Sequence, residues 1–440
     1  MSNPIWSKPG ATGADEEVQA FLAGEDVLLD RHLFAFDIAA TRAHAGALKS
    51  AGILSAREYD ALDIGLAELG AAAEQGLFEL GPPHEDGHSA IEAFLTERLG
   101  DVGRKVHTGR SRNDQVQVAT RLYMRDRLEA LAALCIGIAT ELLARADADG
   151  DLPMPGYTHI QRAVPSSVGL WMAGLGEAFT DIAELALLTR GWMNTNPLGT
   201  AAGYGVNLPL DRDATTVELG FDRMQVNPMY AQNSRGRFEL QALGVLAQAT
   251  LEARRLAWDL SLFNTEEFGF VRMPDRYTTG SSIMPNKRNP DVVELLRGMH
   301  GAVQGALAEL QAVISLPSGY QRDLQATKGP LIRAFEGGLQ GLGLVPGLVA
   351  GIEFDAEAMR EAIAPHMHAT DVAIERARDG LPFREAYQTP PDPVDLARRE
   401  PDASLEARVS PGACADLRLP ELNARLEEIR GLVDDLPGTG

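Results

Sequence analysis

The sequence contains little lysine, few aromatic residues and almost no cysteine. Only five of its 440 residues are lysine, and aromatic residues make up 6%. The two cysteines, Cys135 and Cys414, lie far apart, so no disulfide framework or zinc site is indicated. No apolar run is long enough to span a membrane, and residues 1–13 lack the pattern of a secretory signal. We therefore expect a cytoplasmic protein without a membrane partner.

Positive charge is scarce in the chain as a whole. The 40 lysine and arginine residues are outnumbered by 62 aspartate and glutamate residues, which gives a formal net charge of −22. Because such a chain repels phosphate backbones and anionic lipid, no nucleic-acid partner is expected. Any small anionic ligand would need a locally positive site.

The residues that are abundant favour helices. Alanine and leucine recur at helical spacing. Long amphipathic helices with short connectors predict an all-α bundle. Apolar residues extend around much of each helix, so we also expect an oligomer with a shared helical core. Long helices are predicted over 115–149, 166–193, 235–264, 291–314 and 330–351.

Breaks in this pattern divide the chain into three expected domains. Residues 1–106 form a mainly helical N-terminal domain, in which Ser55 and Glu58 have the spacing of a capping box. Residues 107–353 form the long-helix bundle and carry the polar loops. Residues 354–440 form a smaller helical domain.

One polar loop, residues 280–290, contains two serines, a lysine and an asparagine between a glycine and two prolines. Neither a regular helix nor a regular strand is expected there, because proline lacks an N–H group and restricts the residue before it. Such a loop can offer backbone N–H groups, a hydroxyl and an ammonium group to an anion. The alternative is an ordinary surface loop.

A second polar segment, residues 107–114, places Arg110 and Arg112 beside two hydroxyl residues and a glycine. Arginine suits planar recognition of carboxylates. The structural alternative is a helix N-cap at Ser111 or Asn113. Both can hold, because a helix N-terminus itself favours anions.

Two further segments concentrate polar side chains. In residues 156–165, His159 lies between Thr158 and Gln161 and is a candidate proton carrier, although a lone histidine is more often structural. Residues 318–328 could form a binding cluster, although solvated polar loops often have a similar composition. Its candidate members are Tyr320, Gln325 and Lys328.

Taken in order, these segments resemble those of the argininosuccinate lyases, the branch of the fumarase/aspartase superfamily that also contains the delta crystallins. The resemblance covers roughly residues 29–387, and the His-Thr-Gly-Arg-Ser-Arg-Asn-Asp block at 107–114 distinguishes this branch. It implies a three-domain all-α fold and a homotetramer whose active sites combine several subunits. It also implies a small-molecule substrate, reversible cleavage of argininosuccinate to arginine and fumarate in the last step of arginine biosynthesis, and no metal or organic cofactor.

The resemblance also implies roles for individual residues. Ser281 is the expected base, with Ser282 as the adjacent alternative, and Lys287 and Asn289 are expected to stabilise the carbanion. His159 is expected to act as the acid, to relay a proton or to position the substrate. Glu294 would polarise His159, within one chain or across a subunit boundary.

Substrate binding is assigned by the same resemblance. Ser111, Arg112, Asn113 and Thr158 are expected to hold the fumarate carboxylates, with Gln161 beside them. Tyr320, Gln325 and Lys328 are expected to hold the arginine end, Lys328 through its carboxylate.

The sequence departs from the family pattern where the amine half of the substrate could be sensed. An acidic segment is replaced by residues 233–238, which contain Arg235 and Arg237, and the usual Tyr-Asn pair is Tyr320-Gln321. Two alternatives therefore stay open. One is a carbon–nitrogen lyase that releases fumarate from another N-succinyl amine, and the other is a non-catalytic structural homolog of the crystallin kind.

Overall fold

A computed structural model describes residues 16–81 and 84–436. Residues 1–13, where no secretory signal is expected, lie outside this part. The chain divides into two compact units, each assembled from three segments. Unit 1 comprises Met1–Ala130, Ala186–Val245 and Val303–Glu336, and unit 2 comprises Leu131–Leu185, Leu246–Ala302 and Gly337–Gly440. The three consecutive domains expected from the sequence stay a prediction.

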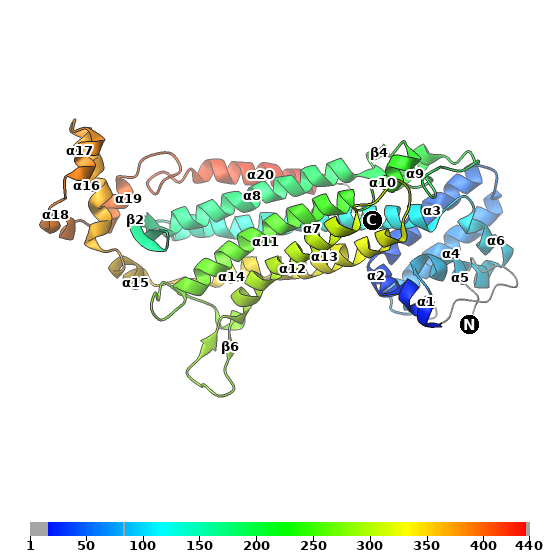
Figure 1. Ribbon diagram of the computed structural model, residues 1–440, viewed down its shortest axis with the longest axis horizontal. Helices are drawn as coiled ribbons and strands as arrows, with labels where there is room; N and C mark the ends of the chain where they lie inside the picture. The colour runs from blue at the N-terminus through cyan, green and yellow to red at the C-terminus, as the bar shows by residue number, and fades with distance from the viewer. Residues whose placement is uncertain (1–15, 82–83, 437–440) are drawn as a thin grey trace. The chain divides into compact units, whose positions relative to one another are not determined.

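Long helices dominate the structure (Figure 1), as the sequence predicts. Each contributes residues to both units, because the unit boundaries fall within the helices. The longest, α7, is free of proline and rich in alanine and leucine, which lets the backbone hydrogen-bond ladder continue without a break. The helices predicted first to fourth are α7 (Arg112–Ala148), α8 (Val168–Met193), α11 (Arg237–Phe263) and α12 (Asp291–Val313).

The prediction of one continuous fifth helix over 330–351 is wrong. This region is two helices, α13 (Lys328–Leu342) and α14 (Val345–Gly351). Pro346 lies in the first turn of α14, where its missing N–H group is tolerated. In an uninterrupted helix the same proline would clash with the carbonyl four residues earlier.

Unit 1 adds shorter helices around an apolar core that includes Leu48, Leu62 and Leu95. The predicted capping box is confirmed: Ser55 Oγ accepts from the Glu58 N–H, and the Glu58 carboxylate accepts from the Ser55 N–H. These helices are α1 (Glu16–Ala23), α2 (Asp26–Leu29), α3 (Phe34–Ser50), α4 (Ala56–Glu74), α5 (Gly87–Leu99), α6 (Asp101–Arg104), α9 (Arg212–Glu218) and α10 (Pro228–Asn233). A two-residue parallel pair joins β3 (Thr195–Asn196) to β4 (Arg223–Met224).

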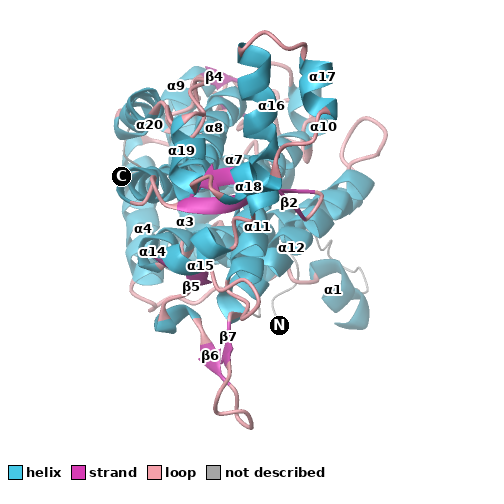
Figure 2. Ribbon diagram, turned by 90° about the vertical axis from the view of Figure 1, so that its left-hand side faces the viewer, coloured by secondary structure: helices cyan, strands magenta, loops and turns pink. Residues whose placement is uncertain are grey.

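Unit 2 contains three antiparallel strand pairs and a series of short helices (Figure 2). The pairs are β1 (Pro153–Thr158) with β2 (Gln161–Ser167), β5 (Val271–Arg272) with β8 (Glu353–Phe354), and β6 (Thr279–Gly280) with β7 (Arg288–Asn289). The helices are α15 (Ala356–Glu361), α16 (Ala369–Arg378), α17 (Phe383–Gln388), α18 (Pro393–Ala397), α19 (Pro401–Glu406) and α20 (Leu419–Asp434).

The predicted all-α class is confirmed, because the strands of the described residues form only two-stranded pairs. Two of these pairs nevertheless organise the polar segments. Residues 156–165 lie in the β1–β2 hairpin, and the 280–290 loop is closed at its base by β6 and β7. Within residues 16–81 and 84–436, no helix is long and apolar enough to cross a bilayer.

Candidate active site

Unit 1 contains a small polar pocket that brings together four of the predicted binding residues. Arg112 and Asn113 reach it from the first turn of α7, and Tyr320 and Gln325 come from the segment between α12 and α13. Two segments that are about two hundred residues apart in the sequence therefore meet within one chain.

Ser111 is the N-cap of α7. Its Oγ accepts from the Asn113 N–H across 3.3 Å, and the Asp114 carboxylate accepts from the Ser111 N–H across 2.9 Å. Ser111 thus caps the second N–H group of the helix, and Asp114, at the third helical position, accepts from the N-cap N–H group in return. Buried Asp114 also accepts from two backbone N–H groups of the 199–201 loop. The structural interpretation of Ser111 is thus confirmed, and the cap fixes the turn that presents Arg112 to the pocket.

The guanidinium group of Arg112 is paired within the protein. One of its nitrogens lies 3.2 Å from a carboxylate oxygen of Glu85 and 3.2 Å from one of Asp86. Burial alone would raise the pKa of Asp86, but the neighbouring His88 and Arg112 outweigh it and lower that pKa. Arg112 therefore enters the pocket with much of its charge already balanced.

The ammonium group of Lys328 is enclosed by two carboxylates. Its Nζ lies 2.7 Å from Asp30 Oδ1 and 2.9 Å from Asp26 Oδ1, and the side chain is only 2% exposed. Burial by itself would lower the pKa of Lys328, but Asp30 and Asp26 raise it, so the group stays charged. The contact predicted between Lys328 and a substrate carboxylate stays a prediction, because in this structure both bonds go to the protein.

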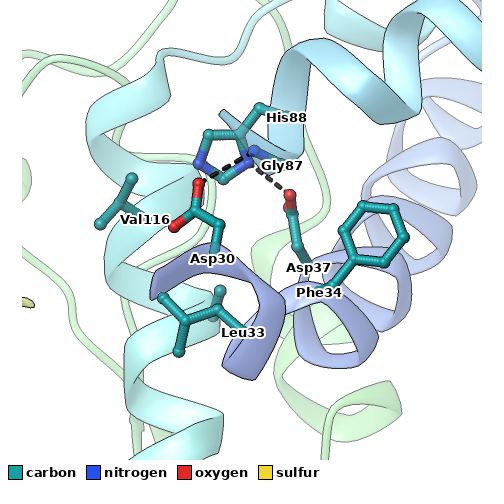
Figure 3. Close-up of a pocket in the computed structure, with 8 residues that line it drawn as sticks. Asp30, Leu33, Phe34, Asp37, Gly87, His88 and Val116 are labelled. Carbon is teal, nitrogen blue, oxygen red and sulfur yellow. Dashed lines mark hydrogen bonds and ion pairs between the residues drawn. The ribbon is translucent and has the colours of Figure 1, made fainter. Parts of the chain in front are cut away.

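A second buried charged pair lies next to Asp30 (Figure 3). His88 Nδ1 and Asp37 Oδ2 are 2.5 Å apart, and the Gly87 N–H donates to Asp30 Oδ2 across 2.9 Å. Sequence reasoning assigned no role to Asp26, Asp30, Asp37 or His88. Asp37 and His88 lie more than fifty positions apart in the sequence, so no local pattern reveals that they meet.

In unit 2, His159 lies at the tip of the β1–β2 hairpin. Thr158 pairs with Gln161, so His159 and Ile160 form a two-residue turn with φ of 55° and 58°. Both central residues of such a turn need positive φ, which only a few per cent of non-glycine residues adopt. All four residues are exposed in the single chain. The hairpin thus holds a histidine outward at some cost in backbone energy.

The β6–β7 hairpin carries the predicted elimination loop and projects away from the adjoining end of α12 (Figure 2). Ser281 Oγ accepts from the backbone N–H groups of Met284, across 3.1 Å, and Ile283, across 3.4 Å. Among the described residues, Ser282 makes no corresponding bond. The geometry around the two serines is therefore different, and the N–H groups converge on Ser281.

The other polar residues of this region have few partners. Lys287 is exposed, and no carboxylate of the described chain lies within ion-pair distance of its ammonium group. Asn289 pairs with Thr279 at the base of the hairpin. Glu294, in the first turn of α12, lies 3.8 Å from Arg297, and the described residues show no bond between it and His159. The predicted pairing of Glu294 with His159 stays a prediction.

The predicted site residues therefore fall into two groups. Six lie in unit 1 and seven in unit 2, and the structure brings members together within each unit. The unit 1 group is Ser111, Arg112, Asn113, Tyr320, Gln325 and Lys328, and the unit 2 group is Thr158, His159, Gln161, Ser281, Lys287, Asn289 and Glu294.

Comparison with known proteins defines the class first. A lyase family matches residues 15–305. The solved structure of EDDS lyase in complex with formate shares the fold, with a TM-score of 0.80 at 24% identity, over 96% of this chain and 93% of that one. The chain thus matches a lyase family over most of its length and shares its fold with a lyase of known structure.

More similar relatives define the family within this class. Argininosuccinate lyase from Xanthomonas campestris pv. campestris (strain B100) is 56% identical over 432 residues, covering 98% of this chain and all of the relative. Argininosuccinate lyase from Stenotrophomonas maltophilia (strain K279a) is 56% identical over 431 residues, again covering 98% of this chain and all of the relative. The chain belongs to the argininosuccinate lyase family.

Proposed function

We propose that this protein cleaves argininosuccinate reversibly to L-arginine and fumarate. The observation that carries the proposal is the 280–290 loop, in which two backbone N–H groups converge on Ser281 Oγ. The same short loop carries the ammonium group of Lys287, which forms no ion pair with the described residues. A chain 56% identical throughout to argininosuccinate lyases supports this substrate over other N-succinyl amines. The reaction is the last step of arginine biosynthesis.

Proton removal is the first demand of the chemistry. The proton leaves the succinyl carbon next to a carboxylate, and a serine accepts it only if its oxygen has alkoxide character. The N–H groups of Ile283 and Met284 favour a negative oxygen at Ser281, because hydrogen bonds to a charged form stabilise that form. These bonds support Ser281 over Ser282 as the base.

The carbanion that results spreads its charge onto the adjacent carboxylate. Lys287 and Asn289 are the proposed donors to that carboxylate. The ammonium group of Lys287 is exposed, and no carboxylate of the described residues is paired with it. Electrostatic stabilisation of developing charge is usually the largest contribution to such a rate. Closure of the loop over the substrate would remove competing water.

The carbon–nitrogen bond then breaks, and the departing guanidinium nitrogen takes a proton. His159 is the proposed acid or proton relay, with Glu294 as its partner, and its place at a strained, exposed hairpin tip suits insertion into a site on another chain. Ser111, Arg112, Asn113 and Thr158 are proposed to hold the fumarate carboxylates, with Gln161 beside them. The arginine portion would lie beside Tyr320 and Gln325 in the unit 1 pocket.

We propose that four chains assemble in the cytoplasm and share their active sites. Large apolar side chains are exposed on the long helices, such as Trp258 on α11 at 47% and Leu295 on α12 at 74%. Apolar positions on a helix that its own chain leaves uncovered favour association. A shared site would combine the unit 1 group of one chain with hairpin tips of others.

The test is the reaction of the purified protein with argininosuccinate, followed by the ultraviolet absorbance of fumarate and by quantification of arginine. We expect equal amounts of both products, and none from a Ser281→Ala preparation made in parallel. Absence of fumarate from a folded tetramer would contradict the proposal and move the substrate to a different N-succinyl amine.

A further inference from the structure

His159 is carried by a hairpin whose support decreases toward its tip. Along β1, residues 153–155 are buried, Tyr157 is half-buried and Thr158 is exposed. On β2, the first two residues after the turn are exposed as well. Tyr157 is therefore the last partly buried residue of β1 before the tip.

An open groove of unit 2 lies at the tip of the hairpin. Ile160 and Arg162 of the hairpin line it together with Phe268 and residues of α15. Ile160 is 78% exposed, so its large side chain contributes little packing to hold the turn in place. The position of His159 consequently depends on contacts made further down the hairpin, where Tyr157 lines the same groove.

Tyr157 contacts a cluster of aromatic side chains. The centre of its ring lies 5.9 Å from that of Phe268 and 6.5 Å from that of Phe263, in the range over which aromatic rings attract one another. The described members of the cluster are Tyr157, Trp171, Phe263, Phe268, Phe270 and Phe354. Because aromatic residues make up only 6% of the chain, this concentration beside one hairpin indicates a specific role.

The cluster is fixed to two long helices. Trp171 on α8 donates from its indole Nε1 to Asp259 Oδ2 on α11 across 3.0 Å. Phe268 lies in a closed turn, in which its N–H group donates to Thr265 Oγ1 across 3.3 Å. Because hydrogen bonds hold both the indole and the turn, the cluster presents a defined surface to Tyr157.

A β-bulge directs Tyr157 toward this cluster. The strand pairing shifts between Pro155 and Tyr157, so that Gly156 faces two residues of β2. A Cβ atom at Gly156 would lie 2.9 Å from the carbonyl oxygen of Val164, so the strands can approach this closely only at a glycine. Bulges re-aim side chains and are frequent beside active sites. The bulge thus sets the direction of the side chain two positions before His159.

We infer that Tyr157, held by Phe268, is a positioning residue for His159. Proton transfer requires heavy atoms within about 2.6–3.2 Å, and a misplacement of about 1 Å can lower a rate by about 10²-fold. His159 and Ile160 also adopt positive φ, a conformation that persists only where the surroundings enforce it. The aromatic contact supplies this enforcement at the nearest partly buried position. The inference rests on the proposed function, in which His159 transfers or relays a proton.

Replacement of Tyr157 separates positioning from general packing. Tyr157→Leu removes the ring and should lower kcat for argininosuccinate cleavage by about tenfold to hundredfold, with KM changed by less than about twofold. Tyr157→Phe keeps the ring and should keep most of the activity. Tyr387→Leu is the matched control, because Tyr387 forms a similar tilted pair with Phe383 at 6.5 Å, and it should leave kcat unchanged.

A double-mutant cycle shows whether Tyr157 acts through His159. His159→Gln should lower kcat, and adding Tyr157→Leu to it should cause less than about twofold further loss, since the group to be positioned is gone. Fold reductions that multiply would overturn the inference, as would an unchanged kcat in an assembled Tyr157→Leu protein. Phe268→Leu removes the other ring of the contact, and it takes the same place in the cycle if light scattering shows that Tyr157→Leu does not assemble.

Hydrogen–deuterium exchange tests the same contact without catalysis. Peptides from residues 153–167 should exchange faster in Phe268→Leu than in the unmodified protein or in Tyr387→Leu, because the hairpin opens more easily once its support is lost. Equal exchange rates would contradict the inference. If the unmodified protein does not cleave argininosuccinate, the proposed function fails by itself, and the exchange result still decides whether the cluster holds the hairpin.

Discussion

The backbone N–H group of Met284 donates to Oγ of Ser281 across 3.1 Å, at the start of a loop that also carries Lys287. The bond spans three residues, so the loop itself creates the environment of the serine oxygen. Ser282, one residue further along, makes no such bond among the described residues. The two serines can therefore be separated by experiment.

Ser281→Ala should lower kcat by at least about 10²–10⁴-fold, the contribution expected of a positioned general base. Substrate binding and assembly should change little, because the loop is exposed and carries no core residue. Ser282→Ala is the matched variant and should keep most of the activity. Steady-state kinetics on both, with the oligomeric state checked by light scattering, makes the comparison. Equal activities, or greater loss in Ser282→Ala, would remove Ser281 as the base.

Lys287→Met should lower kcat by about 10²–10³-fold, the effect of removing one donor to a developing anion. Its KM should rise as well, because the same ammonium group attracts the substrate carboxylate. The control is Arg288→Gln, which removes the next cation along the chain, one that is already paired with Asp275. Kinetics in the direction of cleavage will show whether the loss is specific to Lys287. Similar kinetics for Lys287→Met and the unmodified protein would make the loop assignment wrong.

Lys328→Met should destabilise the folded protein by about 3–5 kcal/mol, because it leaves Asp30 and Asp26 buried without their counter-charge. The free energy of unfolding from chemical denaturation measures this loss. Adding Asp30→Asn to the same variant should recover part of it, since one of the uncompensated charges is then removed. A loss within about 0.5 kcal/mol, the range of ordinary surface substitutions, would contradict this account of Lys328.

The contact between His88 and Asp37 predicts a dependence of stability on pH. Burial alone would lower the pKa of His88, but Asp37, with Asp86 and Asp30, outweighs it and raises that pKa in the folded state. Because the pKa of His88 is higher in the folded state, its protonation stabilises the folded protein fully at pH values below the unfolded-state pKa of about 6.5. This stabilisation is lost as the pH rises through the folded-state pKa.

His88→Gln removes this contribution. The difference in free energy of unfolding between the unmodified protein and His88→Gln should therefore be larger at about pH 6 than at about pH 9. Denaturation at both pH values provides the measurement, and His84→Gln is the control, because His84 lies in the connection just before α5 and outside the pair. A difference that grows with rising pH would show that His88 is not held as a cation.

The sequence predicted those structural elements that are determined by residues close together in the chain. The span of α7 follows from a proline-free run of helix-forming residues, and the caps at Ser55 and Ser111 follow from residue types three positions apart. The β1–β2 hairpin was not anticipated as strands, because β1 contains Pro153 and Pro155 and lacks an alternating pattern.

The parts that sequence reasoning missed depend on distant residues. Lys328 and Asp30 are separated by 298 positions, so no local pattern reveals that they meet. Family motifs identified the polar loops, but only the three-dimensional contacts show which charges are already neutralised.

The most direct test of the proposed elimination is the reverse reaction of L-arginine with fumarate in deuterium oxide. Anti addition predicts argininosuccinate with deuterium at one of the two hydrogen positions of the succinyl methylene group, seen as a single diastereomer by NMR. Deuterium at both positions, or no argininosuccinate from the assembled protein, would contradict the account.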